Sequence, residues 1–110
     1  MATSSARVVT DRPGRYAKQL AAHMARKIDT DWDADSGVGE LRFPFGTSSL
    51  RAEPDALLLT VDGAAEDLER LEAVVGKHLV RFGAKDELVV HWTRDTGEAG
   101  TQWRHDGDDE

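Results

Sequence analysis

Two histidines, His23 and His78, are the residues of this sequence best suited to bind a ligand. An α-helix turns by about 100° per residue. This rotation places His78 inside the apolar arc of a predicted helix, between Val74 and Leu71. It places His23 at the edge of the apolar stripe of an earlier predicted helix. Each helix therefore presents one imidazole toward, or near, the surface on which it packs.

An imidazole in such a place must satisfy two ring nitrogens, and three interpretations remain open. In the first, a tyrosine hydroxyl or a backbone carbonyl satisfies each histidine in the core. In the second, the histidines, with help from Tyr16, Lys27 or Arg81, line a small pocket between the helices, or between a helix and the sheet edge. This pocket would bind an anion, a chelate or a metal. In the third, they act as acid and base, although no nucleophile or phosphate loop accompanies them. We predict no metal site, because two histidines without a third ligand hold a metal poorly.

Acidic residues recur between positions 29 and 40 with the spacing of ligands in an EF-hand loop: Asp29, Asp31, Asp33, Asp35 and Glu40. The position that needs glycine for the sharp turn of that loop is Ala34. Alternate spacing also places the aspartates on one face of a strand, where their repulsion discourages pairing with another sheet. We predict the solvent face of an edge strand, with a weak cation site as the alternative.

Two helices must position the histidines. Apolar residues recur every four positions in residues 12–28, which predicts an amphipathic helix there, with Pro13 in its first turn. A second helix is predicted over residues 64–82 and ends at Gly83, because glycine favours that position.

The remaining elements are predicted to be strands. Residues 6–10 and 88–92 each form one strand, and apolar residues alternate through residues 29–61 with turns between short segments. Consecutive strands joined by short turns are antiparallel neighbours. The order strand, helix, four strands, helix, strand predicts a two-layer α+β sandwich, with a mostly antiparallel sheet and both helices on one face.

Composition excludes several classes of protein. The 110 residues include no cysteine and carry a net charge of −7, which excludes a disulfide scaffold or a thiolate metal centre and disfavours nucleic acid as a partner. No apolar run is long enough for a membrane span, and the N-terminus lacks the pattern of a secretory signal. We therefore expect a cytoplasmic protein that does not bind membranes.

The chain is predicted to hold a single domain over residues 6–93, flanked by disordered ends. Residues 94–110 contain six acidic and two basic residues with almost no aliphatic side chain. Such a segment buries too little apolar surface to offset the entropy lost on ordering. We therefore predict a disordered acidic tail at residues 94–110 and a disordered N-terminus at residues 1–5.

An ordered series of segments forms a recognisable pattern: residues 10–20 with His23 and Lys27, residues 43–46 and 50–53, residues 75–82, and residues 88–92. This series resembles a bacterial family, the domain of unknown function 2218. The resemblance implies a small α+β domain, common in actinobacteria and proteobacteria, without an established activity. It also implies an association with siderophore-interacting and iron-uptake proteins. The positions to which the family pattern points are His23, Lys27, His78 and Arg81.

We predict a small, non-catalytic binding or accessory domain linked to iron or siderophore handling through an anionic ligand or ferric chelate. His23 and His78 would supply adjustable hydrogen bonds, while Lys27 and Arg81 would hold the anion. One alternative is an enzyme that uses the two histidines as acid and base. Another is a structural, protein-interaction domain that forms a homodimer through the open sheet face around Val9, Leu58 and Val89. The sequence names no cofactor.

Overall fold

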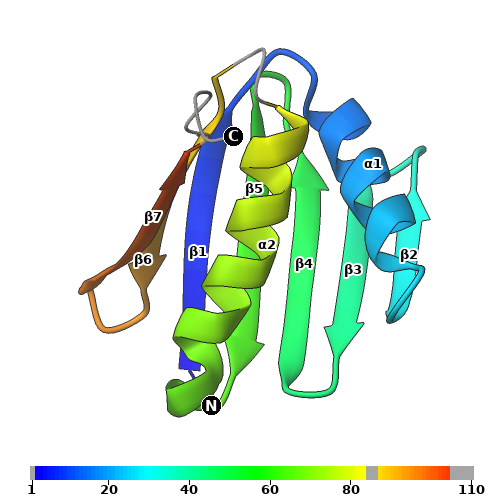
Figure 1. Cartoon of the computed structure of the whole chain (residues 1–110). Helices are drawn as coiled ribbons and strands as arrows, with labels where there is room; N and C mark the ends of the chain where they lie inside the picture. Colours follow the sequence, from blue (N-terminus) through cyan, green and yellow to red (C-terminus); the bar gives the residue numbers. More distant parts are fainter. Residues whose placement is uncertain (1, 84–86, 105–110) are drawn as a thin grey trace.

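The computed structural model describes residues 2–83 and 87–104, in which seven strands form one antiparallel sheet. Both helices lie on the same face of this sheet (Figure 1). In chain order the elements are β1 (Ala2–Val9), α1 (Pro13–Met24), β2 (Asp29–Asp33), β3 (Val38–Phe43), β4 (Gly46–Ala52), β5 (Ala56–Gly63), the single-turn η1 (Ala65–Asp67), α2 (Leu68–Phe82), β6 (Val89–Arg94) and β7 (Ala99–Arg104). The predicted α+β class is confirmed.

The strand order across the sheet is β2-β3-β4-β5-β1-β6-β7. The four consecutive strands β2 to β5 form an antiparallel meander, as their short turns predict. The first strand, β1, then inserts beside β5 and pairs with β6 on its other side. This arrangement leaves one sheet face covered by α1 and α2 and the other face open (Figure 1).

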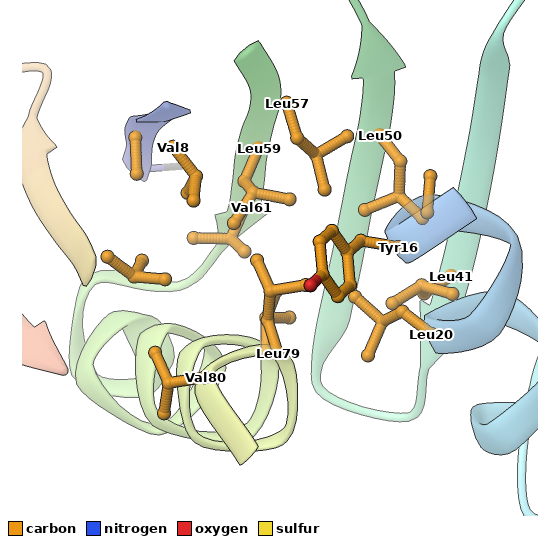
Figure 2. Packing of buried hydrophobic residues seen from close by; sticks show 14 of the residues in the cluster. Val8, Tyr16, Leu20, Leu41, Leu50, Leu57, Leu59, Val61, Leu79 and Val80 are labelled. Carbon is orange, nitrogen blue, oxygen red and sulfur yellow. The ribbon is translucent and has the colours of Figure 1, made fainter. Parts of the chain in front are cut away.

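The core fills the space between the sheet and the two helices. Helix α1 contributes Tyr16 and Leu20, and helix α2 contributes Leu79 and Val80, above leucines and valines of the central strands (Figure 2). The stripe of α1 is buried at every fourth position through Met24, as its period predicts. The two apolar stripes therefore fix how each helix is rotated, and with it where each histidine points.

The first helix is shorter than predicted. It ends at Met24, and residues 25–28 turn the chain so that β2 begins at Asp29. In this turn the N–H groups of Lys27 and Ile28 both donate to the Met24 carbonyl. Ile28 continues the four-residue period because its side chain still packs against the core from the turn. The four-residue period of buried apolar residues therefore continues past the end of α1, which is why the predicted helix was too long.

The predicted disordered ends are wrong where the structure describes them. Residues 2–5 belong to β1, in which Ser4 is buried between β5 and β6. Residues 99–104 form β7, whose Trp103 packs against the core. The low apolar content of residues 94–110 concealed this strand, because a single tryptophan and a backbone ladder are enough to anchor it. Met1 and residues 105–110 lie outside the described residues.

The predicted edge strand is present as β2. Asp29, Asp31 and Asp33 are exposed on its solvent face, and the neighbouring Arg42 of β3 forms ion pairs with Asp29, Asp31 and Glu40. These pairs raise the pKa of Arg42, mainly through its hydrogen bond to Asp31. In the described part of the chain, neither helix is long and apolar enough to cross a membrane.

Candidate functional site

The two histidines come together at the junction of α1 and α2. The ring centroids of His23 and His78 are 5.1 Å apart, with a tilt of 43° between the ring planes. The edge of the Phe82 ring contacts His23 at a centroid distance of 5.2 Å. Two residues that are 55 positions apart in the sequence therefore meet here. Both rings are partly exposed rather than turned fully into the core.

His78 is fixed by its own helix. Its Nδ1 lies 2.7 Å from the Val74 carbonyl oxygen, one turn earlier in α2. A carbonyl oxygen accepts hydrogen bonds and cannot donate them, so Nδ1 must carry the proton. In the neutral ring this leaves Nε2 with a free lone pair. The backbone therefore determines both the orientation of His78 and the nitrogen that it offers to a ligand.

His23 sits in a positive environment. Partial burial lowers its pKa below the ordinary value for histidine, and neighbouring positive charges lower it further. Those neighbours are His78, Arg26, Lys27 and Arg81. The same charges that disfavour a protonated His23 would favour an anion beside it.

The other predicted site residues divide into two groups. Lys27 and Arg81 are exposed and close enough to affect the charge of His23, so both remain candidates for holding an anion. Tyr16 is buried in the core cluster, where its ring lies between α1 and α2 beside Leu79 (Figure 2). Tyr16 therefore belongs to the floor beneath the helix junction more than to its surface.

The surface around the histidines is basic although the whole chain is acidic. No aspartate or glutamate occurs in residues 12–28 or 73–83. Those two segments include all of α1, the turn after it and the last two thirds of α2. Their exposed basic side chains are Arg12, Arg15, Lys18, Arg26, Lys27, Lys77 and Arg81. A local excess of positive charge on a protein of net charge −7 concentrates anions at the helical layer.

A second polar cluster, which the sequence analysis missed, surrounds Glu72 in the middle of α2. Its carboxylate is fully buried and accepts hydrogen bonds from Arg94 Nε and Nη2, each 3.1 Å long. The N–H and hydroxyl groups of Thr101 donate to Glu72 Oε1 at 3.0 Å, and Trp103 Nε1 donates to the Thr101 hydroxyl at 2.7 Å. We call Glu72, Arg94, Thr101 and Trp103 the Glu72 cluster.

The Glu72 cluster attaches the hairpin of β6 and β7 to α2. Burial raises the pKa of Glu72, but hydrogen bonds from Arg94, Ser4 and Thr101 outweigh burial and lower the pKa overall. Gly76 is needed for close packing, since a Cβ there would lie 2.8 Å from the Trp103 ring. With its carboxylate saturated by internal partners, this cluster has a structural role.

The sequence contains a pattern from which the burial of Glu72 could have been predicted. Glu72 lies four residues after Leu68 and three before Val75, which places it within the buried stripe of α2. A carboxylate at such a position needs a positively charged or hydrogen-bonding partner. The partners, however, come from a hairpin that composition had assigned to a disordered tail.

The open face of the sheet carries shallow hollows. One, of about 590 Å³, lies around Arg7, Thr60 and His91. Another, of about 390 Å³, lies around Val38, Arg51 and Leu58. Neither includes the two helical histidines, so these two hollows and the histidine pair lie on opposite sides of the molecule.

The fold is that of a small α+β domain in which one antiparallel sheet supports two helices. The chain belongs to the family described as "Uncharacterized protein conserved in bacteria (DUF2218)", whose model matches residues 5–93. The resemblance inferred from the sequence is therefore confirmed. The matched range ends before β7, so it includes Glu72 and excludes Thr101 and Trp103.

A solved structure shares this fold. The NMR structure of PA4090 from Pseudomonas aeruginosa is 28% identical to the chain, with a TM-score of 0.70. The alignment covers 84% of this chain and 96% of PA4090. None of the curated proteins matches the chain.

Proposed function

We propose that this protein is a non-catalytic binding module that holds a small anionic ligand at the junction of α1 and α2. The observation that carries the proposal is the approach of His23 and His78 to 5.1 Å within a group of positive charges. Partly exposed imidazoles supply hydrogen bonds that adapt to a ligand. Exposed cations supply charge-assisted contacts to its carboxylate or phosphate oxygens.

The finer proposal is that the ligand takes part in iron or siderophore handling. Iron carriers built on carboxylates keep negative charge when they hold a ferric ion, so they suit a basic surface. Lys27 and Arg81 are the residues that would contact the carboxylates of such a chelate. The choice of iron in this refinement depends on the family resemblance. The choice of an anionic ligand depends on the local positive charge.

Calorimetric titration with citrate tests the anion site. We expect Lys27→Gln and Arg81→Gln each to weaken citrate binding about fivefold, since each removes an exposed charge worth about 1 kcal/mol. Lys18→Gln is the matched control, because Lys18 lies about 140° around α1 from His23. Equal weakening by Lys18→Gln would show diffuse electrostatics and no site, and undetectable citrate binding would contradict the proposal.

A second candidate function is a protein-interaction domain that pairs with another copy of itself through the open sheet face. Val9 of β1 is 68% exposed there, Val89 of the neighbouring β6 is 41% exposed, and Leu58 of β5, on the other side of β1, is partly exposed. One half of the face is acidic through Asp29, Asp31 and Asp33 of β2. The other half carries the basic groups Arg7 of β1 and His91 of β6.

This charge distribution favours one geometry of self-association. A two-fold axis parallel to the strands would place the β2 side of one copy over the β1 and β6 side of the other, which brings opposite charges together. The test is the molar mass in solution by light scattering. We expect a dimer that Arg7→Glu dissociates and Lys18→Glu leaves intact. A monomeric wild-type protein at high concentration would exclude this function.

A further inference from the structure

We propose that His23 and His78 together ligate the metal ion of an anionic metal chelate, each through one imidazole nitrogen. This inference rests on the proposed anion-binding function and states how the ligand is recognised. The protein supplies two ligands and the bound organic chelator supplies the others. The ligand class is thus a chelate that leaves two adjacent coordination positions of its metal free.

The separation of the two rings is compatible with one shared metal ion. A metal bound to a histidine nitrogen lies 2.0–2.1 Å from that nitrogen, and therefore about 3.2 Å from the ring centroid. Two imidazoles on one metal, at bond angles between octahedral and tetrahedral, then have centroids about 4.5 to 5.2 Å apart. The observed separation of 5.1 Å falls within this range.

His78 already has the environment of a metal ligand. Histidines that bind metals commonly donate the other ring N–H to a backbone carbonyl or carboxylate, which fixes the tautomer and the ring orientation. The Nδ1 of His78 makes this contact with the Val74 carbonyl at 2.7 Å. The nitrogen left for a metal is Nε2, whose lone pair the tautomer keeps free.

The surrounding charge selects a chelate over a bare cation. Arg26, Lys27 and Arg81 all act on His23 as positive charges, and they would repel an uncomplexed divalent ion. Within the described residues, no group of three or more histidine, cysteine, aspartate or glutamate side chains could hold a metal unaided. An anionic chelate meets both conditions, because it brings its own ligands and its net charge is attracted.

Two chelates that carry the same single negative charge separate coordination from electrostatics. Nickel(II) nitrilotriacetate leaves two adjacent positions open to histidine, whereas cobalt(III) ethylenediaminetetraacetate is saturated and inert. Calorimetric titration uses the untagged full-length protein with each complex. We expect the nickel complex to bind at least about tenfold more tightly than the cobalt complex, as expected for direct coordination.

The variants assign the coordination to particular residues. His23→Gln and His78→Gln should each weaken nickel nitrilotriacetate binding by at least about tenfold. His91→Gln, on the open sheet face, should leave it unchanged, and circular dichroism confirms that each variant is folded. Unchanged binding after both substitutions at the junction would overturn the inference.

The possible failures are distinguishable. If both chelates bind equally and only Lys27→Gln or Arg81→Gln weakens them, coordination is overturned and the anion-binding function stands. If neither complex nor citrate binds, both proposals fail. If nickel nitrilotriacetate binds through His91, the inferred site is wrong and the open face is the one that coordinates it.

Discussion

Helix α2 carries one member of the Glu72 cluster, Glu72, and one of the histidine pair, His78. The two groups differ in how completely the protein satisfies their hydrogen-bonding atoms. The Glu72 carboxylate is fully buried and receives hydrogen bonds from Arg94 and Thr101. His78 and His23 are partly exposed, and His78 donates a hydrogen bond to the Val74 carbonyl of its own helix. A saturated polar group stabilises the fold, whereas a group with unused hydrogen-bonding capacity and access to solvent is available to a ligand.

The comparison predicts its largest effect at Glu72. Replacing Glu72 with glutamine leaves Arg94 without its carboxylate partner inside the protein, and we expect a loss of about 3 kcal/mol of unfolding free energy. Urea denaturation measures this change. Glu69→Gln, at an exposed position of the same helix, is the matched control and should change stability by less than about 0.5 kcal/mol. Similar small effects at both positions would show that the cluster does not stabilise the fold.

The second largest loss of stability is expected in β7, the strand that the sequence composition did not reveal. Trp103→Ala removes a partly buried ring and a donor to Thr101, so we expect a loss of about 2 kcal/mol. Amide hydrogen exchange should show faster exchange in β7 than in β1. Gln102→Ala, at the exposed neighbouring position, should leave both measurements unchanged. If Trp103→Ala behaves like this control, β7 is not anchored by its tryptophan.

Acid should weaken the Glu72 cluster in a predictable direction. The pKa of Glu72 is lower in the folded protein than in the unfolded chain, so the ionised carboxylate stabilises the fold above its ordinary pKa of about 4.5. This stability is lost as the pH falls from that value through the lower pKa of the folded state. Thermal unfolding of wild type and Glu72→Gln across this range should converge toward low pH. Parallel curves would contradict the assignment.

The smallest effect on stability is expected at the histidine pair. His78→Gln removes a partly exposed ring with one hydrogen bond to its own helix, and should cost no more than about 1 kcal/mol. The same variant should lose nickel nitrilotriacetate binding. If His78→Gln unfolded the protein while Glu72→Gln remained stable, the predicted order of the two stability losses would be wrong.

The sequence predicted most of the architecture because burial in this fold follows regular periods. The four-residue recurrence of α1 and the alternation through β2 to β5 each correspond to a buried face. The same arithmetic turned His23 and His78 each toward the surface on which its helix packs, since helix rotation is set by the apolar stripe. It could not give their separation, which depends on how α1 and α2 cross above the sheet.

Two features were beyond this kind of reasoning. The strand β7 has no large aliphatic residue and is held by Trp103 and by backbone pairing with β6. Its sequence therefore shows no apolar alternation from which a strand could be predicted. The partners of Glu72 likewise depend on tertiary contact, because Arg94 and Thr101 lie more than twenty residues away. A buried acidic residue within an apolar stripe should therefore prompt a search for a partner segment, even where composition indicates disorder.

The most direct test of the histidine junction is a map of backbone and histidine NMR shifts during titration with diamagnetic zinc(II) nitrilotriacetate. The account predicts shifts at the imidazole nitrogens of His23 and His78 and at the backbone of residues 22–28 and 74–83. The resonances of Glu72 and of the open sheet face should stay unchanged. Shifts confined to His91 and its neighbours, or none at all, would contradict it.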